Sequence, residues 1–491
     1  AATHAIPTPN HSQSHSKMPS RRGSIVKVSP FVPAPVETTV KPAPAELAAA
    51  FAKLKTAKPD FPYDGHPDRE VVAVVDPYST GACVAAAAAK RGFKIIHVMS
   101  APESGTMEEM VPKHLRGLSY IATLRADEAL PFAERAKSLA AELRKACGDL
   151  KLVAVLPGAE VGVELAEALA AETGLCGNAV ATSRARRDKN EMGEKVRSAG
   201  VRAVRQLKTT EWSPVAAWLV ADWGLPPDHT DVTPCALVVK PIDSAGSDGV
   251  TLCETVGAAR AAVAKLVGAI NALGIKNEAV LVQEWLRGDE YVIDGVSRAG
   301  IHKITGIWRY DRRPTNGAAF VLHGQELVSS TDAPAGLLQY ATQVLDALEF
   351  QNSAFHMECK HNPETGDICL VEVGARTHGG SGDWISIADE AVGLNQVVAN
   401  VDASVSAEAF DALPNEPPAA LRASGRIKAL LFHEAGDLRD VNVGAITSLP
   451  SYRGHAVYAK LGSAVAPTKD LFGWGGAVKL ANADAEQLVK D

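Results

Sequence analysis

The chain has 491 residues, and 50 Lys and Arg against 57 Asp and Glu give a formal net charge of −7. Its 46% hydrophobic and 22% charged content is ordinary for a globular chain, and two to four domains are expected at this length. This charge gives no reason to expect a nucleic-acid partner, and no apolar run approaches the roughly 20 residues of a membrane helix. Seven scattered cysteines without a CxxC pair are typical of reduced thiols in an intracellular protein.

Residues 1–60 are predicted to be a basic tail and linker. The stretch 1–36 has no Asp or Glu and carries Lys17, Arg21 and Arg22 among Ser, Pro, His and Ala. Such a segment cannot bury enough apolar surface to offset its ordering entropy, which favours disorder. The same composition is typical of an organelle-targeting leader. The expected location is therefore the cytoplasm, or a plastid or mitochondrion if the tail is a leader.

Residues 65–185 predict an N-terminal α/β domain. The segment 69–101 predicts a strand, a turn, an Ala-rich helix and a second strand, which is a β-α-β unit of a parallel sheet. The segment 150–178 repeats the strand, a Pro-Gly turn and a helix. The turn before each helix exposes N–H groups that could face an anion. The fingerprint GxGxxG is absent from both, so dinucleotide binding is disfavoured.

Residues 186–402 predict a second domain, and residues 403–491 predict a small β-rich C-terminal lobe. Helical and strand periodicities alternate along the second domain, with turn residues between them. The expected elements are a charged helix at 187–201, two strands around a glycine loop at 236–250, a helix at 257–273, three strands at 279–313, a helix at 334–350, a hairpin at 353–375 and a helix at 389–402.

A lysine and a glycine loop are the first candidate site. Lys240 ends an apolar run, and SAGSDG follows at 244–249. Small residues let backbone N–H groups approach a polyphosphate closely, while the lysine supplies a compact positive charge. The pattern is not the Walker motif, and a plain surface turn is the alternative.

Two glutamates near strand ends are the next candidates. Glu284 follows the run AVLVQ and precedes Trp285-Leu286. Its carboxylate could accept hydrogen bonds from ribose hydroxyls, while the adjacent backbone could pair with an adenine edge. Either Glu284 or Glu290 could instead be an exposed strand end.

The hairpin at 353–375 carries Glu358 on one strand and Glu372 on the other. Both carboxylates can face one side at neighbouring positions, where they would repel and raise each other's pKa. A divalent cation between them removes that problem, and Mg²⁺ prefers one or two carboxylates together with phosphate oxygens. A solvated hairpin face is the alternative.

The stretch that follows Glu372 suits anion chemistry. Arg376 presents a planar donor fork for phosphate or carboxylate, and Gly379-Gly380 leave backbone N–H groups accessible. His378 could titrate or merely pack. Upstream, Trp308 to Arg313 leave a strand with three arginines, of which Arg309 and Arg312 could grip an anionic substrate or form a charged surface turn.

In this order and spacing, the motifs over residues 65–491 resemble the ATP-grasp superfamily, and more closely its carboxylate–amine ligase branch, which includes dipeptide (L-amino-acid) ligases. The resemblance implies an α/β chain with an ATP-grasp fold, an N-terminal parallel-sheet (preATP-grasp) domain and a small C-terminal β-rich lobe. It also matches Lys189, in DKNEMGEKVRSAGV, to the family's first lysine.

The residues and the resemblance together predict three kinds of site. The predicted ATP-binding residues are Lys189, Lys240, Ser244, Gly246, Ser247, Gly249, Glu284, Trp285, Leu286 and Glu290. The predicted ligands of Mg²⁺ or Mn²⁺ are Glu358 and Glu372. The predicted catalytic residues are Arg376, Gly379 and Gly380, and the predicted substrate-binding residues are Arg309, Arg312 and His378. One departure is Gly374, where many members have an Asn metal ligand; the dipeptide-ligase branch often has a small residue there, so the resemblance to that branch is favoured.

The implied activity is ATP-dependent activation of a carboxylate, expected to be that of an amino acid, as an acyl phosphate. An amine then attacks, and an amide or peptide bond forms with release of ADP and phosphate. The open alternatives are a biotin-carboxylase-like or purine-biosynthetic ligase, and a nucleotide-binding protein without turnover. Expected partners are ATP and small acid and amine substrates, with no nucleic acid and no membrane, and a homodimer is possible.

Overall fold

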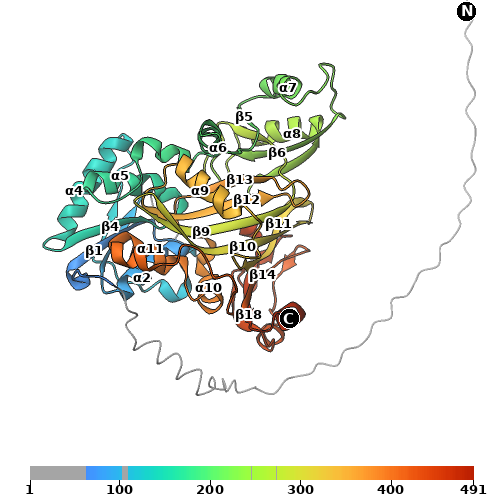
Figure 1. Ribbon diagram of the computed structural model, residues 1–491. Coiled ribbons are helices and arrows are strands. Elements are labelled where there is room, and N and C mark those ends of the chain that lie inside the picture. Colours follow the sequence, from blue (N-terminus) through green and yellow to red (C-terminus); the bar gives the residue numbers. More distant parts are fainter. Residues whose placement is uncertain (1–61, 102–108, 245, 273) are drawn as a thin grey trace, which may run out of the picture. The chain divides into compact units, whose positions relative to one another are not determined.

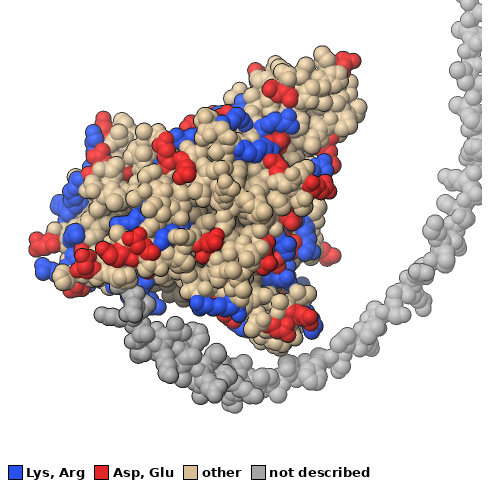
Figure 2. All heavy atoms as spheres, viewed as in Figure 1, with Lys and Arg blue, Asp and Glu red and all other residues tan. Residues whose placement is uncertain are grey.

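The computed structural model describes residues 62–101, 109–244, 246–272 and 274–491. The predicted tail at 1–60 lies outside the described residues. By its internal contacts, Phe61–Asp491 is one unit. Within the described ranges, no helix combines the length and the apolar character needed to cross a membrane. On the face shown in Figure 2, Lys and Arg side chains are interspersed with Asp and Glu.

The described chain begins with a parallel sheet of strand order β3-β2-β1-β4. Strand β1 (Glu70–Val75) is buried along its whole length, because helices cover both faces of the sheet (Figure 1). The other elements of this part are η1 (Pro67–Arg69), α2 (Thr80–Lys90), β2 (Lys94–Met99), η2 (Lys113–Leu115), β3 (Ala122–Arg125), α4 (Phe132–Cys147), β4 (Lys151–Pro157), η3 (Glu160–Gly162), α5 (Val163–Thr173) and η4 (Val180–Arg186).

A second sheet is antiparallel, has the strand order β5-β8-β6-β7 and carries the glycine loop between β6 and β7. Helices α7 and α8 pack their apolar side chains onto it. The elements are α6 (Lys189–Ser198), β5 (Gln206–Thr209), α7 (Trp212–Ala221), β6 (Pro234–Pro241), β7 (Thr251–Thr255), α8 (Val256–Leu266) and β8 (Val280–Glu284).

A third sheet, with the order β13-β12-β9-β10-β11-β14-β18-β16, is antiparallel throughout. Tyr291 and Ile293 pack on one face with α9, and Val292 and Trp308 pack on the other with α10 and α11. The elements up to α12 are β9 (Asp289–Arg298), β10 (Ile301–Thr315), β11 (Ala318–Val328), α9 (Leu337–Ala347), β12 (Ser353–His361), β13 (Ile368–Gly374), η5 (Gly380–Gly382), α10 (Ile385–Ala391), α11 (Gln396–Val405) and α12 (Ala407–Ala412).

The end of the chain extends the third sheet. Strand β14 pairs with β11, so strands of the predicted C-terminal lobe continue the sheet of the preceding domain. The three predicted domain boundaries stay predictions. The last elements are β14 (Ser424–Leu430), β15 (Gly436–Asp437), α13 (Val443–Thr447), β16 (Tyr452–Val457), β17 (Ala464–Val465), η6 (Leu471–Gly473), β18 (Gly476–Asn482) and α14 (Ala485–Lys490).

Two predicted helices differ from the observed ones. The helix expected at 257–273 ends at Leu266, because Val267 is extended and Gly268 has a positive φ. The helix expected at 389–402 is two helices. Asn395 separates them and caps α11, accepting a hydrogen bond from the backbone N–H of Val398.

Candidate active site

One face of the third sheet gathers charged side chains from neighbouring strands. Glu358 on β12 lies directly opposite Glu372 on β13, and Tyr310 on β10 lies opposite Glu290 on β9. Opposite residues of an antiparallel pair point to the same face, as do residues two apart on one strand. These side chains and Asp294, four residues along β9 from Glu290, therefore share one face, which we call the site face.

Two lysines approach the site face from the second sheet and from α6. Lys189 is the first residue of α6, and its Nζ lies 2.8 Å from Glu372 Oε2 and donates to the carbonyl oxygen of Ser244 at 2.8 Å. Lys240 is buried near the end of β6. Burial and the nearby Lys189 lower the pKa of Lys240 to about 8, against the opposing effect of surrounding glutamates. An incoming polyanion would therefore stabilise the charged form of Lys240.

Two carboxylates on the site face, those of Glu372 and Glu290, have lowered pKa values. Burial alone would raise the pKa of Glu372, but the charges of Lys189 and Lys240 outweigh it and lower that pKa to about 2. Glu290 is buried as well, and its carboxylate oxygens lie 2.6 Å from Arg312 Nε and 3.2 Å from Lys360 Nζ. These cations outweigh the desolvation and keep the pKa of Glu290 below its usual value.

Glu358 has weaker neighbours than Glu372 and Glu290. Its oxygens lie 3.8 Å from Arg312 Nη2 and 3.5 Å from His356 Nε2. Glu358 and Glu372 are thus cross-strand neighbours with hard oxygen donors, which is the donor set that Mg²⁺ takes together with phosphate oxygens.

Arg376 is fixed by a carboxylate that the sequence analysis did not identify. Its Nε lies 2.7 Å from Glu160 Oε2, in the turn after β4. Glu160 also lies 2.9 Å from Arg187 Nη1, and Arg187 in turn lies 2.5 Å from Asp243 Oδ1. The only sequence signal for Glu160 was its place in the Pro-Gly turn before a helix.

The Arg376–Glu160 ion pair explains the glycine at position 374. A Cβ atom added at Gly374 would lie 2.7 Å from Glu160 Oε2 and 3.2 Å from Arg376 Cζ. An Asn side chain at this position would therefore have to displace the ion pair.

A cavity of about 140 Å³ opens at the end of β8, where the adenine site is predicted. Glu284 faces it, but its Oε1 already lies 2.8 Å from Arg202 Nη1 and accepts a hydrogen bond from the backbone N–H of Arg205 at 2.8 Å. Arg202 was not predicted as a site residue. The lining residues are Arg202, Glu284, Trp285, Leu286, Arg287, Lys360, Asn362, Asp367 and Cys369.

The glycine loop at 244–249 reaches toward the site face. The hydroxyl of Ser247 accepts a hydrogen bond from Arg312 Nη1 at 2.9 Å, and the hydroxyl of Ser244 donates to Asp248 Oδ2 at 2.8 Å. Gly246 and Gly249 have positive φ values of +67° and +68°, which side chains rarely adopt. Arg312 thereby ties the loop to Glu290.

The structure separates the two arginines that were predicted to bind substrate. Arg312 lies on the site face, and its Cζ lies 5.2 Å from the centre of the Tyr310 ring. Arg309 points to the opposite side of β10, where it pairs with Glu326 and is 47% exposed. Arg309 therefore does not lie on the site face with Arg312.

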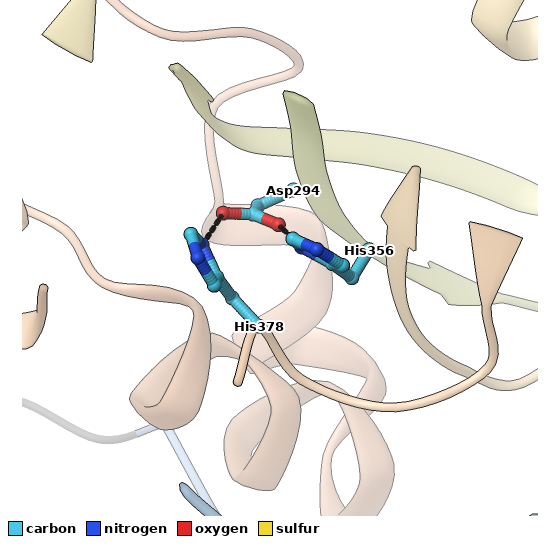
Figure 3. A group of neighbouring side chains, drawn as sticks. All are labelled: Asp294, His356 and His378. Atoms are coloured by element: carbon cyan, nitrogen blue, oxygen red, sulfur yellow. Dashed lines mark hydrogen bonds and ion pairs between the residues drawn. The ribbon is translucent and has the colours of Figure 1, made fainter. Parts of the chain in front are cut away.

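A buried carboxylate joins two imidazole rings on the site face (Figure 3). Asp294 Oδ1 lies 2.8 Å from His356 Nδ1, and Asp294 Oδ2 lies 2.7 Å from His378 Nδ1. Burial raises the pKa of Asp294, but the two histidines outweigh it and lower that pKa below its ordinary value. His378 was a predicted site residue, whereas Asp294 was missed, although an acidic residue within the strand EYVIDGV was a usable signal.

The two imidazoles differ in charge. Burial alone would lower the pKa of His356, but Asp294 raises it to about 9. Burial and the charge of His356 lower the pKa of His378 to about 4, despite the opposing effect of Asp294. One protonated ring therefore balances the buried carboxylate, and His378 is neutral.

Gly379 and Gly380 lie at the start of α2. The carbonyl oxygen of Gly379 accepts hydrogen bonds from Thr80 Oγ1 and Trp384 Nε1, each at 2.9 Å. A Cβ atom added at either glycine would meet no atom within 4 Å among the described residues. The backbone of this pair is therefore open to close approach by a small molecule.

The comparisons with known proteins agree with this geometry. Residues 233–384 match the ATP-grasp domain family. This match supports the predicted relation to the ATP-grasp superfamily. Over 332 residues it is 29% identical to Dapdiamide A synthase from Enterobacter agglomerans, a match that covers 67% of this chain and 72% of that protein.

Solved structures with the same fold include two kinds of ATP-grasp enzyme. An L-amino acid ligase from Bacillus licheniformis superposes with a TM-score of 0.65 at 14% identity, covering 87% of this chain and 96% of that one. A carboxyaminoimidazole ribonucleotide synthase from Aspergillus clavatus, complexed with ATP, gives 0.60 at 14% identity, with 87% and 97% covered. The predicted fold class and superfamily are thus confirmed, and the ligase names agree with the carboxylate–amine ligase branch.

Proposed function

We propose that this protein is an ATP-dependent ligase that activates the carboxylate of an amino acid as an acyl phosphate and couples it to an amine. The observation that carries the proposal is the convergence of Glu358, Glu372, Lys189 and Lys240 at the site face, next to Arg376. This set supplies acidic metal ligands and positive charge for a triphosphate within one site. The similarity to Dapdiamide A synthase and to an L-amino acid ligase supports the same activity.

Charge neutralisation by the chain prepares the first step. Lys189 and Lys240 bind the phosphate oxygens, since Lys189 lies 2.8 Å from Glu372 Oε2 and the charge of Lys240 is buried beside Lys189 and Glu372. Glu358 and Glu372 would hold Mg²⁺, which when bound neutralises phosphate charge and orients the phosphoryl group. A carboxylate oxygen of the acid then attacks the γ-phosphorus, and ADP leaves.

Arg376 and the glycine pair act on the second step. Arg376 is held by Glu160 and can direct its guanidinium to the acyl phosphate. The open backbone at Gly379 and Gly380 can approach the tetrahedral adduct that forms when the amine attacks the carbonyl carbon. The carbon–oxygen bond to phosphate then breaks, and phosphate leaves with the bonding electrons.

Exclusion of water is assigned to the glycine loop at 244–249, because an acyl phosphate hydrolyses when wet. Arg312 joins this loop to the site face through Ser247. The carbonyl oxygen of Gly246 also accepts a hydrogen bond from the backbone N–H of Leu471 at 3.2 Å, which links the loop to the C-terminal part of the chain. The loop is thus supported on two sides.

Phosphate release from ATP across pairs of amino acids tests the proposal. We expect release that requires both an acid and an amine, and we expect Glu372→Gln to abolish it. Release that required bicarbonate and no amino acid would favour the carboxylating or purine-biosynthetic reading. ATP binding without release for any pair would favour a nucleotide-binding protein without turnover.

A further inference from the structure

The hydroxyl of Tyr310 lies on the site face with a histidine behind it. Its oxygen lies 3.4 Å from His378 Nε2, and Arg312 lies over its ring. Tyr310 stands on the same face as Glu290 and Glu358, which is the face to which the proposed function assigns the acyl phosphate. The roles assigned above to lysines, glutamates and Arg376 leave this hydroxyl without a function.

The orientation of His378 is fixed from several sides. Its Nδ1 lies 2.7 Å from Asp294 Oδ2, and its ring stacks on Trp384 at 5.2 Å with an interplanar angle of 19°. Trp308 meets the same ring edge-on at 5.9 Å. Because an ionised Asp294 can only accept, Nδ1 carries the proton and Nε2 presents a lone pair toward Tyr310.

The ligase reaction needs a proton acceptor at this place. An amino-acid amine enters mostly as an ammonium ion at neutral pH, and an ammonium nitrogen has no lone pair for attack. Lysines and arginines on the site face cannot accept that proton while they hold phosphates. The glutamates proposed as metal ligands are committed as well.

We propose that Tyr310, His378 and Asp294 form the relay that takes the proton from the attacking amine. One ammonium proton passes to the Tyr310 oxygen as the phenolic proton passes to His378 Nε2, and the freed lone pair then forms the nitrogen–carbon bond. The carbon–oxygen bond to phosphate breaks, the electron pair leaves with phosphate, and phosphate takes the second nitrogen proton. Tyr310 is the catalytic residue and Asp294 the positioning residue, and the inference rests on the proposed function.

The charges around the relay set its protonation in the free enzyme. Burial and the nearby Glu358 raise the pKa of Tyr310 well above its usual value, so the free enzyme holds a neutral phenol. Asp294 stabilises the imidazolium that forms on His378. The charged or titratable groups that face the two relay rings are Arg312, Glu358, Glu290, Asp294, His356 and Arg376.

Hydroxylamine as the nucleophile distinguishes a role in proton transfer from a role in forming the acyl phosphate. It is largely unprotonated at neutral pH, so it traps an acyl phosphate as a hydroxamate without a proton acceptor. For Tyr310→Phe we expect hydroxamate formation within about twofold of wild type, and amide formation from an amino acid about a hundredfold lower. The amide rate of the variant should also rise with pH, because free amine then becomes available in solution.

The matched control is Tyr291→Phe, which removes a hydroxyl on the opposite face of the same sheet and should change neither rate. Equal losses of hydroxamate and amide in Tyr310→Phe would overturn the inference, and so would unchanged amide formation. If the wild-type enzyme formed neither hydroxamate nor amide with any acid, the proposed ligase function itself would be contradicted, independently of the relay.

The second variant is His378→Gln, with the double variant Tyr310→Phe/His378→Gln. The effects of substitutions within one relay should not be additive. The double variant should therefore lose no more amide activity than the worse single variant. Thermal unfolding of each variant reports folding separately. Fully additive losses in folded variants would contradict a shared relay.

Discussion

At the scale of single residues, Lys240 shows how burial changes the pKa of a site residue. It is buried beside Lys189, and this environment lowers its pKa to about 8. The charged form is therefore less stable than in water until an anion arrives. A buried lysine with this shift is a sensitive reporter of nucleotide binding.

We expect ATP affinity to fall as pH rises through about 8, because the pKa of Lys240 in the free protein is lowered to that value and the neutral amine binds no phosphate. Isothermal titration across this range measures the effect. In Lys240→Arg the charge persists at high pH, so the affinity should be nearly flat with pH. A wild-type affinity independent of pH would contradict the assignment.

A second residue-scale prediction concerns Gly374. Replacing it with Ala should lower turnover by about tenfold or more, because the added Cβ would lie 2.7 Å from Glu160 Oε2 and displace the ion pair that holds Arg376. Gly117→Ala, at a position without a positive φ where an added Cβ meets nothing within 4 Å, is the control. Steady-state turnover rates of both variants test this prediction. A Gly374→Ala rate equal to that of the control would refute the positioning role of Glu160.

At the scale of elements, the alternation of β10 assigns different roles to neighbouring arginines. Tyr310 and Arg312 point to the site face, whereas Arg309 points away and pairs with Glu326. The sequence showed that the arginines could not all face one way, but it could not show which ones face the site. That choice depends on the register with β9, which long-range pairing sets.

Arg312→Ala should therefore lower kcat/KM by about a hundredfold, since it removes the partner of Glu290 and of the glycine loop. Arg309→Ala should change kcat/KM by less than about twofold, because the ion pair of Arg309 with Glu326 lies on the face of β10 opposite the site and is partly exposed. Steady-state kinetics of both variants, with each substrate varied in turn, measure these changes in kcat/KM. If Arg309→Ala lost more kcat/KM than Arg312→Ala, the substrate would bind on the face of β10 that carries Arg309, which would contradict the assigned site face.

The elements that carry local signals were predictable. Period-two alternation and the turn at 362–366 predict the hairpin that pairs Glu358 with Glu372, and the structure confirms it. Partners far apart in sequence were not predictable. Glu160 reaches Arg376, and Asp294 reaches His378, only because separate strands meet in the fold, and a single sequence carries no signal of those contacts.

At the scale of the whole molecule, every residue assigned to the site lies within Phe61–Asp491, which forms one unit. We expect a chain that starts at residue 59 to keep its midpoint of thermal unfolding and its turnover within about twofold, because no assigned group is removed. A fall of several degrees in the midpoint, or loss of activity, would show that the first 58 residues contribute to the enzyme.

The most direct test of the account is to follow a heavy oxygen isotope from the acid substrate. An acyl phosphate forms when a carboxylate oxygen attacks phosphorus, and that oxygen leaves with phosphate when the amine attacks carbon. With both carboxylate oxygens labelled, the account predicts that the phosphate released by the wild-type enzyme carries one labelled oxygen per amide formed. Phosphate without label, alongside normal amide formation, would contradict acyl phosphate chemistry at this site.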